Sequence, residues 1–196
     1  MNRSIHMRRS SSNLVAHNAA DHCHPTRSEY CRTAQNNGCD SASLLLIKDS
    51  NDNLVINNSL TDGGDGIFSA AMGPADPSCP PSPTPCPDCC HWGTDRNVYE
   101  RNDVRFARAL CMESTFAFHN VFKSNRATNC SIAGAWLGYS VNASLIDNDL
   151  SDSPTGVRSR CLTAPPPLAV SAGCCSGSNG CGNDTRALFF TDIVSC

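Results

Sequence analysis

The sequence lacks a strong excess of charge of either sign. Its 196 residues hold 15 lysines and arginines against 18 aspartates and glutamates, a formal net charge of −3. Proteins that bind nucleic acid or an anionic membrane surface through electrostatics usually carry a clear basic excess. We therefore expect no nucleic-acid partner.

Long apolar runs are also missing. The longest, such as "SLLLI" at 43–47, are far shorter than the roughly 20 residues that cross a bilayer as a helix, so no membrane span is expected. The basic start, "MNRSIHMRRSSSN", is followed by no apolar stretch, so no signal peptide is visible. Either the protein is intracellular or its true start lies outside this sequence.

Two further features are scarce: aromatic residues, at 6%, and any sustained helical period with caps. Cysteine, in contrast, is abundant, with 14 residues, which suits an oxidising compartment. Most of these cysteines cluster in a Pro-rich stretch and in the tail, and only Cys111 and Cys130 lie inside the clearest repeats. Spacing alone does not define a disulfide connectivity, so the compartment stays open at this stage.

A six-residue phrase returns five times. Its copies are "NLVAHN", "NLVINN", "NVYERN", "NVFKSN" and "ASLIDN", which begin at positions 13, 53, 97, 120 and 143. Counted from zero, position two is always large and apolar, and position seven is always apolar. Position five is always asparagine: Asn18, Asn58, Asn102, Asn125 and Asn148.

The copy starts are 40, 44, 23 and 23 residues apart. A period in the twenties is typical of a solenoid, in which each unit buries its apolar face only by stacking on its neighbours. We interpret the two long steps as double steps over an interrupted copy. β-branched and aromatic residues in the phrase favour short strands over helices.

The asparagine column has two physical readings. Asparagine tolerates the left-handed backbone of a tight bend, and stacked amides can form a continuous hydrogen-bonded ladder along a solenoid. Alternatively, asparagine is simply common in turns. Five occurrences in register favour the ladder.

This N-x-φ-x-x-N phrase, in which φ is apolar, resembles the repeat of right-handed parallel β-helices of the pectate-lyase-like superfamily. The pairs Gly66-Ile67 and Gly156-Val157, at equal offsets in their copies, strengthen the resemblance. It implies an all-β solenoid, apparently fragmentary, which is extracellular or periplasmic and binds or processes polysaccharide. We expect a disordered N-terminus at 1–12, coils at 13–72 and 97–157, a Pro/Cys-rich loop at 73–96 and a low-complexity tail at 158–196. The loop and tail are either real insertions or products of a disrupted reading frame.

Metal sites have little support in the sequence. "CPDCCH" at 86–91 offers thiolates and an imidazole, but no second ligand pair at zinc-finger spacing follows it. "DHCH" at 21–24 places two histidines beside a carboxylate, a pattern that is more often an exposed turn. We therefore expect no metal site and no cofactor, with calcium as the one ion that polysaccharide enzymes of this kind could use.

Glycoside cleavage needs two carboxyl groups about 5–9.5 Å apart, which neighbouring coils of a β-helix could supply. The weak catalytic candidates are Asp103, Glu113, Asp147, Asp149 and Arg126. Further charged residues that could take part are Asp62, Asp65, Asp152, Arg101, Arg105 and Arg108. The acidic motifs of polygalacturonases and of alginate epimerases are absent, and charged residues between apolar positions usually form a solvated face. Whether the protein is an enzyme is therefore open. If it is one, we expect a polysaccharide lyase or a glycoside hydrolase.

Trp136 and Tyr139, in "AWLGYS", are the candidates for stacking against a sugar ring. The competing reading is that Trp136 caps the apolar interior. A polysaccharide or glycan partner is expected from the resemblance. The alternatives are a non-catalytic structural or adhesive surface module, or an accessory factor that resembles the periplasmic β-helix proteins of copper-enzyme maturation. The sequence does not indicate an oligomeric state.

Overall fold

The structure is a computed structural model that describes residues 4–23, 41–70, 93–138, 140 and 142–160. Within these residues the protein is built of β-strands without helices. The strands, in chain order, are β1 (Ile5–Arg8), β2 (Leu14–Ala16), β3 (Ala42–Ile47), β4 (Leu54–Ile56), β5 (Asp65–Ala70), β6 (Val98–Glu100), β7 (Leu110–Thr115), β8 (Val121–Lys123), β9 (Ala133–Gly138), β10 (Ser144–Ile146) and β11 (Val157–Arg160).

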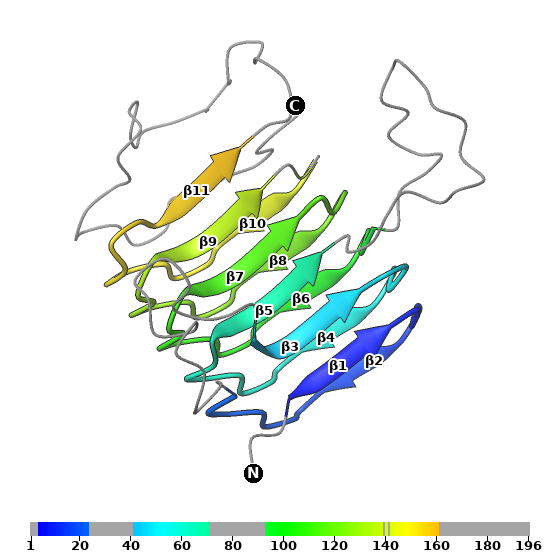
Figure 1. Ribbon diagram of the computed structural model, residues 1–196, viewed down its shortest axis with the longest axis horizontal. Helices are drawn as coiled ribbons and strands as arrows, with labels where there is room; N and C mark the ends of the chain where they lie inside the picture. Colours follow the sequence, from blue (N-terminus) through cyan, green and yellow to red (C-terminus); the bar gives the residue numbers. More distant parts are fainter. Residues whose placement is uncertain (1–3, 24–40, 71–92, 139, 141, 161–196) are drawn as a thin grey trace.

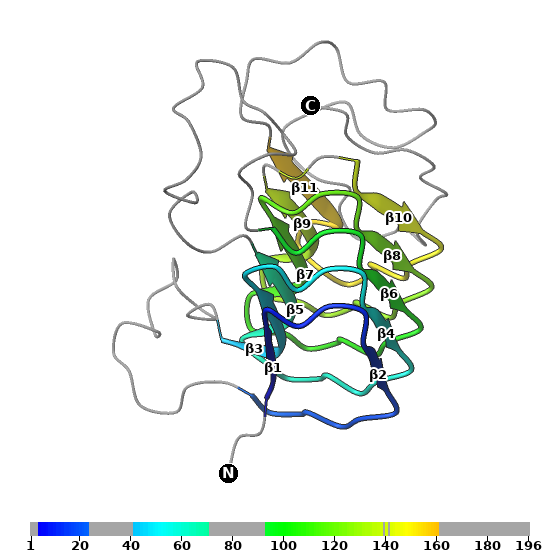
Figure 2. The ribbon, with the colours of Figure 1, turned by 90° about the vertical axis from the view of Figure 1, so that its right-hand side faces the viewer.

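Odd and even strands form two separate parallel sheets. Sheet A has the order β1-β3-β5-β7-β9-β11, and sheet B has the order β2-β4-β6-β8-β10. The chain therefore alternates between the sheets, and each circuit, which we call a coil, lies on the one before it (Figure 1). Figure 2 shows the two sheets facing each other across the interior. An all-β stack of parallel strands is confirmed, and it is compatible with a parallel β-helix.

The 40- and 44-residue steps are single steps, which corrects the double-step interpretation. β2 pairs directly with β4, and β4 pairs directly with β6, with Val15 opposite Val55 and Val55 opposite Tyr99. No coil lies between them. The additional residues of the two steps, 24–40 and 71–92, fall outside the described part of the chain.

The expected segment boundaries also change. Residues 5–8, expected to be disordered, form β1, which pairs with β3, and residues 158–160, assigned to the tail, continue β11. Gly93 and Thr94, assigned to the loop, are buried, and the N–H of Asp49 donates to the Gly93 carbonyl at 2.9 Å. These segments join the coils because they complete ladders of backbone hydrogen bonds.

The interior is filled by matching side chains from successive coils. Position two of the phrase supplies Tyr99 and Phe122, whose rings stack with centroids 4.6 Å apart. Sheet A contributes a second inward column, from which Leu44, Ile67 and Met112 are essentially inaccessible to solvent. Because each rung repeats the same inward residues, the apolar core is continuous along the stack.

Position five forms a hydrogen-bonded ladder, which we call the trailing ladder because it follows the sheet B strands. Oδ1 of Asn125 accepts the backbone N–H of Asn102 at 2.9 Å and its amide Nδ2 at 3.1 Å. Nδ2 of Asn125 donates in turn to Oδ1 of Asn148 at 2.9 Å. The same bonds join Asn18 to Asn58 and Asn58 to Asn102.

A second ladder, the leading ladder, precedes sheet B at position zero. The backbone N–H groups of Asn13, Asn53 and Asn97 donate to Oδ1 of the asparagine in the next coil at 2.8–2.9 Å, and the series ends at Asn120. The sequence interpretation missed this ladder because the fifth copy begins with alanine, at Ala143.

The ladder asparagines do not themselves adopt the left-handed backbone, which corrects one of the two reasons given for them. The residue before each trailing-ladder asparagine does, with φ of 52–57°. Those residues are His17, Asn57, Arg101, Ser124 and Asp147. These five residues are all polar, but only one of them is an asparagine, so the left-handed bend does not require asparagine, and position five selects asparagine for its amide.

Candidate functional site

The outer face of sheet A contains the most chemically varied column of the molecule. In register across its strands are His6, Leu45, Phe68, Glu113, Trp136 and Arg158. Phe68 is buried, Glu113 and Trp136 are partly exposed, and Arg158 is exposed. An acid, an indole and a base thus lie on three consecutive strands, β7, β9 and β11, with access to solvent.

Gly138 determines where the indole of Trp136 lies. A Cβ on Gly138 would come within 2.9 Å of Cε2 of that ring and still closer to Nε1. The ring therefore lies along its own strand, over the space that the missing side chain leaves. Trp136 does not cap the interior, because its strand neighbours Ala135 and Leu137 are the inward-facing residues.

Arg158 and Glu113 flank this ring. The guanidinium of Arg158 lies 5.2 Å from the indole centroid, within cation–π range. Glu113, opposite Trp136 on β7, accepts a hydrogen bond from Thr115 Oγ1 at 2.8 Å. We call Glu113, Thr115, Trp136, Gly138 and Arg158 the Trp136 surface. It offers an apolar ring beside hydrogen-bonding and charged groups, which is a binding chemistry.

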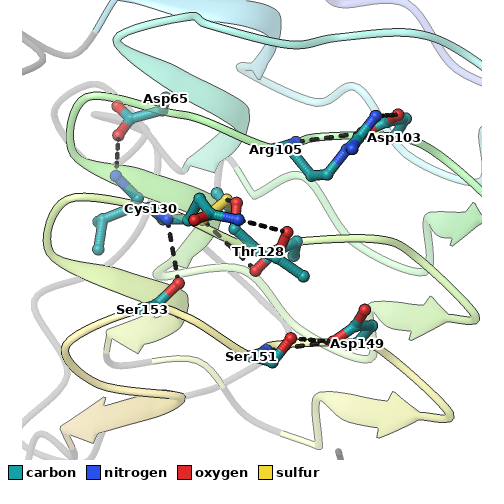
Figure 3. The surroundings of a disulfide bond; sticks show 12 residues. Asp65, Asp103, Arg105, Thr128, Cys130, Asp149, Ser151 and Ser153 are labelled. Carbon is teal, nitrogen blue, oxygen red and sulfur yellow. Dashed lines mark hydrogen bonds and ion pairs between the residues drawn. A yellow bond between two sulfur atoms is a disulfide. The ribbon is translucent and has the colours of Figure 1, made fainter. Parts of the chain in front are cut away.

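A second group of candidates lies at the corner after sheet B. Asp103, Arg126 and Asp149 are successive bridge partners along one column. Asp103 is held by Arg105 through hydrogen bonds of 2.6 and 2.7 Å, which raise the pKa of Arg105, and Asp149 accepts from Ser151 Oγ at 2.7 Å (Figure 3). Two coils separate the carboxylates, about 10 Å of stack, and Arg126 occupies the coil between them. The structure does not place Asp103 beside Glu113, which is on a different face.

The remaining charged candidates are dispersed. Asp62 contacts His22 Nδ1 at 2.5 Å and Arg108 Nε at 3.6 Å, and Asp65 is buried, with Oδ1 accepting the N–H of Leu110 at 3.0 Å. Arg101 pairs with its neighbour Glu100 at 2.6 Å. Asp147 and Asp152 are exposed corner residues with φ above 50°.

The structure does not group the candidate metal ligands that it describes into a metal site. Across the described ranges, no group of three or more histidine, cysteine, aspartate or glutamate side chains is arranged to hold an ion. Asp21 is instead a structural acceptor, bonded to the N–H and Oγ1 of Thr61 and to Oγ of Ser59, each at 2.9 Å. The "CPDCCH" stretch, Tyr139 and His24 lie outside the described residues. No helix in the described part is long and apolar enough to cross a bilayer.

In the part of the chain that the structure describes, one covalent link joins neighbouring coils. Cys111, on β7, and Cys130, from the following coil, form a disulfide with their Cα atoms 5.7 Å apart. Both residues are buried in the core, and the N–H of Cys130 donates to Ser153 Oγ at 3.0 Å (Figure 3). The sequence interpretation singled out these two cysteines as the ones inside the repeats but left their pairing open.

Sequence reasoning missed Arg158, Thr115 and Gly138 at the Trp136 surface. The signal for Arg158 was available, because it follows the Gly156-Val157 pair, which marks the start of its strand. Thr115 and Gly138 could not be predicted as part of this surface, because only the strand register places them beside Glu113 and Trp136.

The chain matches no family model, and a search of curated proteins finds no match.

Proposed function

We propose that the protein binds polysaccharide at the Trp136 surface. The observation that supports this most is the seating of the Trp136 indole over Gly138, partly exposed and flanked by Arg158 and Glu113. A sugar ring has an apolar face that packs on an indole, and hydroxyl groups that bond to charged side chains at its edge. The column direction, perpendicular to the strands, suits an extended polymer whose successive units meet successive coils about 4.8 Å apart.

The architecture in this proposal is a right-handed parallel β-helix like that of the pectate-lyase-like superfamily. The two parallel sheets and the stacked coils support it. Strand-to-strand connections between parallel neighbours are right-handed in nearly all proteins, which supports the hand.

The proposed activity is binding without cleavage. Glu113 is the only carboxylate in its column, and Asp103 and Asp149 have Arg126 between them. Cleavage of a glycosidic bond calls for a pair of carboxyl groups on either side of one scissile bond. Binding needs no cofactor, and calcium enters only as a variable in the assay.

An extracellular or periplasmic location is part of the proposal. The buried Cys111–Cys130 disulfide supports it, since such bonds form and persist mainly in oxidising compartments. A purely structural or adhesive role is the second candidate, favoured by the exposed apolar residues Leu14 and Leu54 on sheet B.

A glycan array tests the proposal. The full chain, with and without calcium, is expected to bind a limited set of polysaccharides, and Trp136→Ala is expected to lose that set. Phe106→Ala is the matched control, because Phe106 is another exposed aromatic residue, 48% accessible, that lies away from sheet A's outer column. Absence of binding, or equal binding by Trp136→Ala, would leave the structural or adhesive role as the better account.

A further inference from the structure

The outer face of sheet B is apolar and open. Its first outward column is Leu14, Leu54, Val98, Val121 and Ser144, in register on the five strands. Leu14 is 66% exposed and Leu54 is 37% exposed, and no residue of the column is buried. The inward residues between them, such as Val55, Tyr99 and Phe122, are fully buried, so the two faces of these strands differ sharply.

The second outward column contains the two charged residues of the sheet B strands themselves. It reads Ala16, Ile56, Glu100, Lys123 and Ile146. Glu100 and Lys123 are opposite each other on the adjacent strands β6 and β8, with an isoleucine beyond each of them. Glu100 bonds to Arg101 through Oε1, and Lys123 has no carboxylate partner among the described residues. Two opposite charges in the middle of an apolar face are a recognition element.

We propose that this face binds the same face of a second copy of the chain. A two-fold axis that runs along the strands, between β6 and β8, keeps each column opposite itself and reverses the order of the coils. Glu100 then faces Lys123 of the second copy, and Lys123 faces its Glu100. The same axis places Ile56 opposite Ile146 and Val98 opposite Val121. One operation therefore satisfies both charge pairs and both apolar pairs.

An arbitrary apolar sheet would not give this match of charged and apolar residues across a two-fold axis. A shift of the axis by half a strand spacing, onto β6 itself, would place Glu100 against Glu100 and Lys123 against Ile56. A self-complementary surface is the requirement of a two-fold interface, and here the sequence meets it at one register.

The size of the face sets the expected strength. The four matched strands span about 14 Å across the sheet, and three residues span about 10 Å along each strand. The area that these two lengths enclose is small beside the roughly 800 Å² that each partner buries in a standard interface. The dimer is therefore weak and depends on protein concentration. β2, with the exposed Leu14, lies beyond the four matched strands and faces no described strand of the second copy.

Sedimentation equilibrium of the full chain tests this, between about 5 and 500 μM. The wild-type protein is expected to pass from the 20.9 kDa monomer toward a mass of twice that value. Glu100→Lys and Lys123→Glu are each expected to raise the dimer dissociation constant at least tenfold, because each variant places like charges opposite one another twice. The double variant Glu100→Lys/Lys123→Glu is expected to regain most of the association, since its charges are exchanged but still complementary.

Thermal unfolding of each variant separates loss of association from loss of folding. Asp152→Lys, which makes a comparable charge change at an exposed corner outside sheet B, is the control and keeps the wild-type association. A monomer at 500 μM overturns the proposal, and so do single variants that associate as well as wild type or a double variant that fails to recover. Growth beyond a dimer, or binding of insoluble polysaccharide that Lys123→Glu abolishes, would assign the face to another occupant and equally overturn it.

Discussion

Oδ1 of Asn125 accepts two hydrogen bonds from Asn102, one from its backbone and one from its side chain, while Nδ2 of Asn125 donates to the Tyr99 carbonyl at 2.9 Å. Asn125 is 1% exposed, so water cannot replace these bonds. Nδ2 of Asn125 also donates to Oδ1 of Asn148 in the next coil, so this single side chain connects three successive coils. The repeating asparagine is a structural element that holds the coils in register.

Asn125→Ala is expected to lower the free energy of unfolding by roughly 3–5 kcal/mol. It removes the acceptor of the Asn102 N–H and the amide donor to the Tyr99 carbonyl, while Oδ1 of Asn148 loses one of its two donors. Each buried unsatisfied group costs about 1–3 kcal/mol. Urea denaturation measures the change. Asn18→Ala is the matched control in the same ladder: Asn18 is exposed, in the first described coil, and its loss should cost under about 1.5 kcal/mol. Equal losses in both variants would contradict a role for buried amides.

Replacing both Cys111 and Cys130 with alanine is expected to destabilise the protein by about 3 kcal/mol. The bond closes a loop with a sequence separation of 19, and the chain-entropy model gives this magnitude for such a loop. The variant should unfold at lower urea, with the slope of the transition showing whether the unfolded state has also expanded. Unchanged stability would mean that the two sulfur atoms are not bonded in solution.

The stability of the first coils should depend on pH through Asp21. Burial alone would raise the pKa of this carboxyl, but hydrogen bonds from Thr61 and Ser59 outweigh it, and the net effect lowers the pKa below its ordinary 3.8. Because the folded pKa is the lower one, the contribution is complete above pH 3.8 and disappears as the pH falls through the folded value.

Urea denaturation of wild type and Asp21→Asn between pH 2 and 7 measures this. The difference in unfolding free energy should be constant at neutral pH and shrink below about pH 4. Thr61→Val, which removes one donor to Asp21 and keeps the others, should give an intermediate curve. A difference that grows on acidification would have the wrong sign for this account.

Much of sheet B could be predicted from sequence, because one phrase contains the inward residue, such as Phe122, and the corner that follows it. Sheet A was less visible. Its strands have alanine, serine or glycine at inward or outward positions, as in the strand with Ala135 and Gly138, and so show no recurring letter. The long steps were misread because an insertion and a missing copy both lengthen a period, and only pairing, such as Leu54 with Val98, distinguishes them.

The candidate site was predictable in part. Trp136 was identifiable as an aromatic residue beside glycine, whereas its partner Arg158 comes from the next coil and depends on register. Asp103 and Glu113 are close in sequence, yet the corner between them places them on different faces. Spacing along the chain therefore does not predict which carboxylates meet in a solenoid.

Gly138→Ala is expected to displace the Trp136 indole, because the new methyl group would occupy the space where the ring lies. The tryptophan emission should shift and glycan affinity should fall by tenfold or more, while the fold persists. Gly156→Ala is the control, since a Cβ there meets no atom within 4 Å, and it should leave both signals unchanged. A chain that tolerates Gly138→Ala without a spectral change would contradict the ring placement.

Polysaccharide binding at Trp136 is the central claim, and calorimetric titration with the best ligand from the glycan array tests it most directly. Wild type and Phe106→Ala should bind with the same affinity, while Trp136→Ala should show no measurable heat and Arg158→Ala a reduced affinity. Full affinity in Trp136→Ala, with its fold intact by circular dichroism, would contradict the claim.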